Sequence, residues 1–489
     1  MRHVEFVIVG AGLSGLAMAL ALQQAGLHDF VILERAEQPG GTWWHHRYPG
    51  AACDVHAHLY QFGRRPRADW PRAYATRDEI LAYLHRCVAD AGLGTRLRCG
   101  AELIGGHWDE AGARWHLQLR GGGTLAARFV LLSAAPLQQP RLPAIEGLGR
   151  FAGDLLHTSR WDEQLALSGR RVGVIGTAAS AVQIVPALAP RVRELTVFQR
   201  TPNWLLPRWD FAYPRWVQRT LAWPAPGRWH RAALRAGYDA LHAGFQPGSA
   251  TARAVARLCR WQLQRQVRDP ALRQALTPAY PLGCKRVLVS SDYYPALQQA
   301  QVRLETTPVA AATPQGLRLA DGRECALDLI VCATGFDDPR AAPAMALVGA
   351  EGRSLAQAWT RGVGAHLGLA VPGFPNLFLL YGPHTQSGHV PAPCFIEAQA
   401  DFVVRAHRAL QAQGAASLRV RPAVHAAWDR ALQSRLGAGV WAAGCTSWYL
   451  DAQGRNHAIW PGRLADYRRE LQRPIADDYE FRPRHPPVA

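Results

Sequence analysis

Lysine is almost absent from this 489-residue chain: Lys285 is the only lysine, and the other 54 of its 55 basic residues are arginines. Such a uniform choice is typical of a compositional bias, which explains much of the high pI of about 10.1 that accompanies the net charge of +18. The basic residues are spread along the chain, and no helix-turn-helix, zinc-finger or RNA-binding motif accompanies them. We therefore expect no nucleic-acid partner.

The sequence also lacks long apolar runs and regularly spaced cysteines. Glycines interrupt the apolar stretch that begins at Val4, and no cleavage pattern follows it. We therefore expect no membrane span and no signal peptide, and we expect the protein to be cytoplasmic. The nine cysteines, from Cys53 to Cys445, show no CxxC spacing. This favours reduced thiols over a disulfide framework or a zinc site, and we expect no metal.

What the chain does contain is a complete dinucleotide-binding pattern at its N-terminus. A strand over Phe6–Val9 runs into a GxGxxG turn formed by Gly10, Gly12 and Gly15, and a helix and a second strand follow, ending at Glu34. The glycines allow close approach of a pyrophosphate to the helix N-terminus, and Glu34 can accept hydrogen bonds from the ribose hydroxyls. This unit predicts a dinucleotide-binding fold.

A second unit of the same kind starts after Gly169. The sequence RRVGVIGTAASAVQIVPALA reads as strand, turn and helix, and the next strand ends at Gln199-Arg200. Ala178 stands where the middle glycine of the turn is expected, and its methyl group could weaken binding. Arg200 stands where an acidic residue would favour NAD, so it indicates a 2′-phosphate and hence NADPH.

These patterns predict an α/β protein with two Rossmann-like domains of three layers. Between about residues 207 and 279 the strand-helix alternation stops, and Arg and Trp recur in helix-like stretches, which indicates a helical insertion. Its tryptophans could form a lipophilic or membrane-facing entrance. The interpretation that we favour is a set of helices that cover the sheet and carry solvated arginines.

At this point the chain resembles the type I Baeyer-Villiger monooxygenases within the wider flavin-containing monooxygenases. The segments that carry the resemblance are GGTWWHHRYPGAACD at 40–54, FAGDLLHTSRWD at 151–162, GCKR at 283–286, ATGF at 333–336, GFPNLF at 373–378 and SWY at 447–449. The segments at 40–54 and 151–162 are the two fingerprints, and they stand in the family's order between the two dinucleotide turns. The resemblance implies a split FAD-binding domain over residues 1–145 and 341–489, and an NADPH-binding domain over residues 146–340.

The resemblance also assigns residues to the two cofactors and to catalysis. It implies that FAD is bound by Gly10, Gly12, Gly15 and Glu34 together with Thr42, Trp43, Asp54 and Tyr60. It also implies that NADPH, or the site that the two cofactors share, is bound by Arg200 together with Gly176, Thr177, Ser180, Lys285 and Trp448. His157, in the connection between the domains, is expected to couple their movement. Arg286 matches the catalytic arginine, whose fixed charge favours anionic oxygen, and Asp54 is expected to hold its guanidinium. The only lysine thus falls where the family places a cation on the NADPH 2′-phosphate, a point contact that suits an ammonium group.

The function that follows is an FAD- and NADPH-dependent insertion of one oxygen atom of O2 beside a ketone carbonyl, through a C4a-peroxyflavin, to give an ester or lactone. One alternative is oxygenation of sulfur or nitrogen by the same cofactor. Another is a flavin-dependent reductase, which the absence of a CxxxxC pair disfavours. A non-catalytic dinucleotide-binding protein is a third, and Ala178 is the one feature that favours it.

Overall fold

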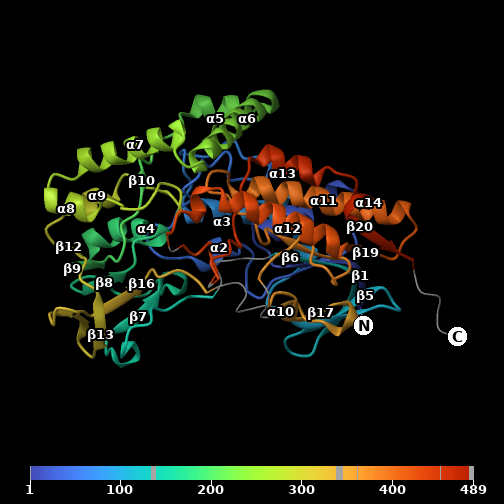
Figure 1. Ribbon diagram of the computed structural model, residues 1–489, viewed down its shortest axis with the longest axis horizontal. Coiled ribbons are helices and arrows are strands. Elements are labelled where there is room, and N and C mark those ends of the chain that lie inside the picture. Colours follow the sequence, from blue (N-terminus) through green and yellow to red (C-terminus); the bar gives the residue numbers. More distant parts are fainter. Residues whose placement is uncertain are drawn as a thin grey trace.

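The computed structural model describes residues 2–133, 139–337, 345–360, 362–445, 447–451 and 453–483. Two sheets lie side by side in the molecule, and helices cover them (Figure 1). No helix among the described residues is both long enough and apolar enough to cross a membrane.

The larger sheet has eight strands drawn from both ends of the chain. Its order is β17 (Ala346–Val348), β4 (Leu103–Asp109), β5 (Arg114–Leu119), β6 (Thr124–Ser133), β1 (Arg2–Val9), β2 (Phe30–Leu33) and β3 (Leu97–Arg98), and β18 (Leu377–Leu380) pairs with β6 in parallel. The strands β2 and β18 are buried along their whole length, as expected for central strands of an α/β sheet. Helix α1 (Leu13–Gln24) packs against α11 (Ala392–Ala412), so the N-terminal unit is completed by the C-terminal third.

The strands of the second sheet are all parallel, and they come from one stretch of the chain, between Asp154 and Cys332. Its five strands follow the order β12 (Val302–Glu305), β9 (Glu194–Phe198), β8 (Arg171–Ile175), β16 (Leu329–Cys332) and β7 (Asp154–His157). Helix α4 (Ala179–Leu188) follows β8 directly, which is the strand-turn-helix arrangement predicted for the second dinucleotide. A core of Val, Leu and Ile side chains lies between α4 and this sheet.

The remaining elements surround these two units. They are α2 (Thr42–His45), α3 (Arg77–Asp90), α9 (Tyr293–Ala296), α10 (Leu355–Ala358), α12 (Pro422–Gly437), α13 (Leu464–Leu471), α14 (Ile475–Asp478), the pairs β10 (Leu205–Leu206) with β11 (Leu288–Val289) and β19 (Ser417–Val420) with β20 (Tyr479–Arg482), and the antiparallel sheet of β13 (Val309–Thr313), β14 (Gly316–Leu319) and β15 (Glu324–Ala326). The predicted α/β class with two Rossmann-like units is confirmed. The domain boundaries remain a prediction, and the one at 340/341 lies outside the described residues.

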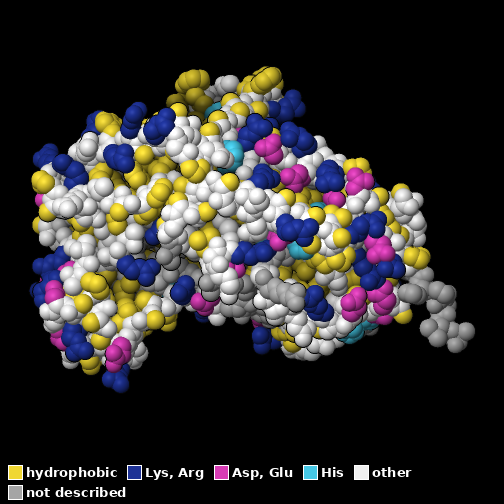
Figure 2. Space-filling model, in the orientation of Figure 1, with side chains coloured by type: hydrophobic (Ala, Val, Ile, Leu, Met, Phe, Trp, Pro, Cys, Tyr) yellow, Lys and Arg dark blue, Asp and Glu magenta, His cyan; other side chains and the backbone are white. Residues whose placement is uncertain are grey.

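The expected helical insertion consists of α5 (Arg215–Ala222), α6 (Pro224–Ala240), α7 (Ala250–Gln266) and α8 (Pro270–Ala275). It extends over the upper edge of both units in Figure 1, and apolar side chains gather on the outer end of α5 and α6 in Figure 2. The five tryptophans of this region are 48–76% exposed: Trp209, Trp216, Trp223, Trp229 and Trp261. Exposed tryptophans agree with both interpretations of this region, a lipophilic entrance and helices that cover the sheet.

Candidate active site

The first glycine turn connects β1 to α1 and leaves no room for side chains. A Cβ atom on Gly15 would lie 1.8 Å from the carbonyl oxygen of Gly10, and one on Gly12 would lie 3.3 Å from the Cα atom of Gly41. Gly12 is the N-cap of α1, and no side chain caps the first-turn N–H groups. Because these groups lie in a cradle that a Cβ would fill, the turn fits the pyrophosphate of FAD.

Glu34 lies directly after β2 and is only 5% exposed. Its Oε2 accepts a hydrogen bond from the Ala11 N–H at 2.7 Å, and its Oε1 accepts one from the Ala36 N–H at 2.9 Å. The backbone of the glycine turn therefore fixes the carboxylate beside that turn. This is the place that the sequence pattern predicts for an acidic residue on the ribose.

The fingerprint loop over residues 40–54 places aromatic side chains on the side of the first unit. Thr42 begins the short helix α2, and Trp43, which is 9% exposed, donates from Nε1 to the Tyr60 hydroxyl at 3.2 Å. The two rings meet edge to face with centroids 5.7 Å apart. Trp43 and Tyr60, two of the residues predicted for FAD, thus form one packed unit.

The same loop contacts the helix of the second unit. The Tyr48 hydroxyl donates to Gln183 Oε1 at 2.7 Å, and Gln183 Nε2 donates to the carbonyl oxygen of Ala52 at 2.9 Å. Gln183 lies on α4, whose first turn contains Ser180. The loop that carries Asp54 is therefore hydrogen-bonded to the unit expected to hold NADPH.

The second turn joins β8 to α4. Gly176 follows the strand, and the Thr177 hydroxyl donates to the carbonyl oxygen of Thr201 at 2.8 Å. Ala178 is the N-cap of α4 and provides no side-chain cap. The first-turn N–H groups of this helix are thus available to an anion, as in the first unit, but beside a methyl group.

Lys285 and Arg200 are close enough to interact electrostatically. Burial, together with the positive charge of Arg200, lowers the pKa of Lys285. The Lys285 ammonium group also lies 4.8 Å from the centre of the Tyr280 ring. Two cations that repel each other across a partly open site fit a dianionic group such as the 2′-phosphate of NADPH.

Asp54 and Arg286, the two predicted catalytic residues, form an ion pair. Arg286 Nη2 donates to both carboxylate oxygens of Asp54, at 2.8 and 2.7 Å. Among the described residues, Asp54 is the only hydrogen-bond partner of this guanidinium group. The neighbouring carboxylate raises the pKa of Arg286, and the arginine side chain is 43% exposed, so a permanent cation is held in place with free donors.

Two tyrosines that the sequence analysis did not assign lie near this ion pair. Burial raises the pKa of both Tyr381 and Tyr449 to about 12, and the charges of Arg286 and Asp54 act on both phenols. Tyr381 directly follows β18 and has a φ of 58°, a conformation that non-glycine residues adopt at a cost and that is concentrated at functional sites. Its position directly after the apolar run LFLL at 377–380 was the signal available in the sequence.

A disulfide corrects the expectation that all cysteines are reduced. Cys284 and Cys445 are bonded, with Cα atoms 6.3 Å apart, which is within the normal range for this bond. The partners are 161 positions apart in sequence, so no local spacing could reveal the pair. The bond joins the segment that carries Lys285 and Arg286 to the segment that carries Trp448 and Tyr449. The other seven cysteines are free.

The remaining predicted residues lie at the edges of the site. His157 ends β7, and its Nε2 lies 2.9 Å from the carbonyl oxygen of Gly335 while its ring packs edge-on against Phe336. It thus connects the second fingerprint to the ATGF motif. Trp448 is 51% exposed and packs on the Tyr449 ring at 4.6 Å between centroids.

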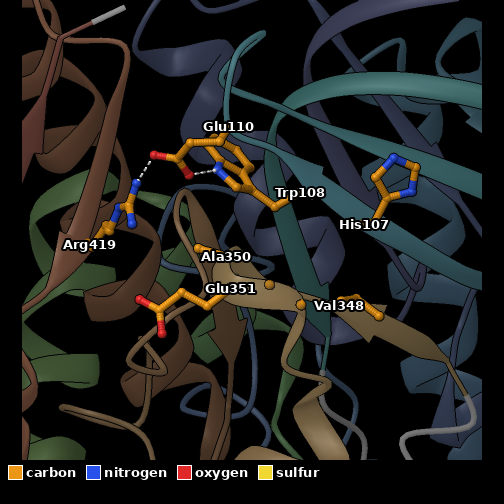
Figure 3. Close-up of a pocket in the computed structure, with 9 residues that line it drawn as sticks. His107, Trp108, Glu110, Val348, Ala350, Glu351 and Arg419 are labelled. Atoms are coloured by element: carbon orange, nitrogen blue, oxygen red, sulfur yellow. Dashed lines mark hydrogen bonds and ion pairs between the residues drawn. The ribbon is translucent and has the colours of Figure 1, made fainter. Parts of the chain in front are cut away.

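A separate hollow of about 400 Å³ lies at the edge of the larger sheet, beside β4 and β17. Figure 3 shows the residues that line it. It is lined by residues of β4, by the segment after β17 and by Arg419. Glu110, at its rim, forms an ion pair with Arg419 and accepts a hydrogen bond from Trp108 Nε1 at 2.7 Å. None of the predicted site residues lines this hollow, so it is distinct from the candidate active site.

Known proteins resemble this chain over almost its whole length. A family described as pyridine nucleotide-disulphide oxidoreductase matches residues 7–220. A Baeyer-Villiger monooxygenase of Streptomyces coelicolor is 40% identical over 98% of this chain and 93% of its own length, and one of Pseudomonas aeruginosa is 38% identical over 94% and 88%.

Solved structures give the same result. The closed structure of cyclohexanone monooxygenase superposes with a TM-score of 0.88 at 25% identity, covering 99% of this chain and 100% of that one. Steroid monooxygenase bound to NADP gives 0.85 at 28% identity, covering 99% and 100%. A structure of OTEMO in complex with FAD and NADP gives 0.86 at 25% identity, covering 98% of this chain and 99% of that one. These findings confirm the resemblance and the two expected cofactors, and none of them favours heteroatom oxygenation. The chain therefore belongs to the Baeyer-Villiger monooxygenases, flavoenzymes that use FAD and NADPH to insert one oxygen atom of O2 into an organic substrate.

Proposed function

We propose that the substrate of this enzyme is a ketone, and that the product is the corresponding ester or lactone. The observation that carries the proposal is the Asp54–Arg286 pair, in which a permanently charged guanidinium is fixed by a carboxylate but remains 43% exposed. A fixed cation of this kind stabilises the negative charge that develops on the former carbonyl oxygen of a ketone. Oxidation of a sulfide places no such charge on the substrate.

Different residues of the chain would bind the cofactors and stabilise the reacting oxygen atoms. When bound, FAD accepts hydride from NADPH and activates O2. Gly12, Gly15 and Glu34 would hold FAD, and Lys285 with Arg200 would orient NADPH by its 2′-phosphate. Arg286 would face the reacting oxygen atoms, and Asp54 would hold the guanidinium group of Arg286 in place.

The tyrosines near the ion pair would keep water away from it. Tyr449 is 3% exposed. Tyrosine phenols are protonated at neutral pH, and burial raises the pKa of both Tyr381 and Tyr449 further, to about 12. They thus add neutral, apolar surface beside the guanidinium. Exclusion of water strengthens the interaction of Arg286 with a developing anion.

Product analysis under 18O2 tests the proposed reaction. The FAD-loaded enzyme is supplied with NADPH and a panel of cyclic, linear and aryl ketones, with alkyl aryl sulfides as a second panel. We expect esters or lactones that each contain one 18O atom. Sulfoxides without any ester from the ketone panel would contradict the proposal.

We expect the enzyme to discriminate strongly between NADPH and NADH. Lys285 and Arg200 can each make a charge-assisted contact with a 2′-phosphate, and losing one such contact costs about 1.5–3 kcal/mol. We therefore expect kcat/KM for NADPH to exceed that for NADH by at least about tenfold. Steady-state oxidation of each cofactor at equal low concentration measures this ratio, and equal efficiencies would contradict the assignment.

Lys285→Ala is expected to weaken NADPH selectively. The ammonium group is replaced while the glycine turns are untouched, so KM for NADPH should rise by about tenfold or more, whereas FAD content and NADH turnover should change little. Arg318→Ala, which removes an exposed arginine of β14, is the matched control. Loss of flavin, or an equal loss with NADH, would show that Lys285 does not contact the phosphate.

The place of action in the cell also remains a proposal. The expected cytoplasmic location rests on the absence of a cleavage pattern and of long apolar runs in the sequence. Fractionation of cells that produce the chain tests it, and recovery in the membrane fraction would contradict it.

A further inference from the structure

Three histidine rings meet where the helical insertion contacts the larger domain, away from the glycine turns. His56 and His58 come directly after the fingerprint segment, which ends at Asp54, and His230 lies on α6. One ring nitrogen from each of the three lies within 4.8 Å of the others. His56 is 8% exposed and His58 is 4% exposed, while His230 is half-buried.

The nitrogens that remain without partners are the ones a metal ion would need. His56 Nδ1, His58 Nδ1 and His230 Nε2 are buried and have no hydrogen-bond partner among the described residues. Buried polar atoms are rarely left in this state, and each such atom requires an explanation. Other buried histidine nitrogens also lack a partner among the described residues. Only in this cluster, however, do three histidines of the described part of the chain meet within 4.8 Å, and this grouping points to a common ligand.

The opposite nitrogens of two rings are already held by protein groups. The Tyr213 hydroxyl lies 2.7 Å from His56 Nε2, and the carbonyl oxygen of Ala68 lies 3.4 Å from His58 Nε2. In metal sites the second nitrogen of a ligand imidazole is typically engaged in this way, which fixes the ring and leaves the other lone pair for the ion. This arrangement assigns Nδ1 of both His56 and His58 as the free lone pair.

The spacing of the rings agrees with a tetrahedral ion. Their centroids are 5.8 Å apart for His56–His58, 5.7 Å for His56–His230 and 5.0 Å for His58–His230. Imidazole nitrogens at about 2 Å from one tetrahedral ion place their ring centres about 5 Å apart. The ligand nitrogens of such an ion lie about 3.3 Å apart. Because those of this cluster lie within 4.8 Å of one another, they would have to approach by up to about 1.5 Å.

The charge of the surroundings does not oppose a cation with three neutral ligands. The nearest charged groups that act on them are Asp210 on His56, and Arg67 and Asp69 on His58. Asp210 is paired with Arg72, and Asp69 with Arg67.

We propose that His56, His58 and His230 bind one divalent transition-metal ion, Zn²⁺ in the simplest case, with a water molecule as the fourth ligand. Three imidazoles suit zinc, and they bind Co²⁺ in the same geometry. The ion has a structural role: it ties α6 to the segment that begins two residues after Asp54. Helix α6 is already attached to the larger domain by the Arg231–Glu397 ion pair at 3.0 Å and by Asp239, which accepts from the Leu464 N–H at 2.8 Å.

The test uses the FAD-loaded, full-length chain without a histidine tag. After treatment with a chelator, Co²⁺ is added, and its d–d absorption is followed at wavelengths beyond the flavin bands. Zn²⁺ is then used to displace it. We expect one Co²⁺ per chain, a tetrahedral spectrum, stoichiometric displacement by Zn²⁺, and a higher melting temperature with Zn²⁺.

Variants show whether the three histidines are the ligands. His58→Ala and His230→Gln should each weaken Zn²⁺ binding by more than about 100-fold, because changing even an outer partner of a ligand costs about 10–100-fold. Tyr213→Phe, which removes the partner of His56 Nε2, should lose about 10–100-fold. His242→Ala, which removes a histidine from the same insertion, should bind as the unchanged chain does.

His230→Gln also guards against simple misfolding, because His230 is half-buried on an outer helix and its replacement should leave the flavin content unchanged. Octahedral Co²⁺, less than one ion per chain, or unchanged Zn²⁺ affinity in His58→Ala and His230→Gln would overturn the proposal.

Discussion

Arg286→Ala is expected to separate cofactor consumption from oxygenation. NADPH will still reduce FAD, because both glycine turns are intact, but oxygenated product should fall by about 10²–10³-fold, the usual effect of losing one fixed charge at a developing anion. The electrons will leave as hydrogen peroxide. Stopped-flow reduction, product analysis and a peroxide assay on the same preparation measure the three quantities.

Arg286→Lys is the informative companion variant. Lysine keeps the charge, but it has no planar fork that could bind Asp54 and face the substrate oxygen at the same time. We therefore expect poor recovery of product formation. Sulfide oxidation with normal coupling in Arg286→Ala would contradict the ketone proposal, because it would show a reaction that does not need the cation.

Gly15→Ala is expected to remove FAD from the enzyme. The added methyl carbon would lie 1.8 Å from the Gly10 carbonyl oxygen, far inside contact distance, so the turn between β1 and α1 must move. We expect a colourless protein with less than about a tenth of the normal FAD, and a loss of about 1–3 kcal/mol in the free energy of unfolding. Absorbance of the purified protein and chemical denaturation measure these effects.

Gly149→Ala is the matched control for this change. A Cβ atom there has no heavy atom within 4 Å, so the variant should remain yellow and equally stable. If Gly15→Ala also retained its full FAD content, the turn could not be the cradle of the pyrophosphate.

The regular parts of the fold could be predicted because short-range patterns specify them. The strand, glycine turn and helix around Gly10 and Gly176 follow from apolar runs broken by glycine, and Glu34 follows from its place after a buried strand. The exact partners of the larger sheet could not be predicted. The pairing of β18 with β6 joins Leu377 to Val130, and no local pattern records such a contact.

The site shows the same division. Asp54 and Arg286 could be named because each lies in a family motif, and their ion pair spans 232 positions. Tyr381 was missed because the features that mark it, a positive φ and burial near the ion pair, arise only in the folded chain. The bond between Cys284 and Cys445 was missed, and the cluster of His56, His58 and His230 was not weighed, since each depends on segments that meet only in the folded chain.

The order of the strands has a consequence for synthesis on the ribosome. The chain emerges from its N-terminus, so β1 to β6 appear first, yet their sheet must wait for β18 and their helix α1 must wait for α11. All five strands of the second sheet are present once Cys332 has emerged, about fifty residues before β18 is complete. We therefore expect the domain encoded in the middle of the gene to fold before the domain encoded at its start. A ribosome stalled between β16 and β18 should hold a protease-resistant second unit above an N-terminal segment that is still open to cleavage.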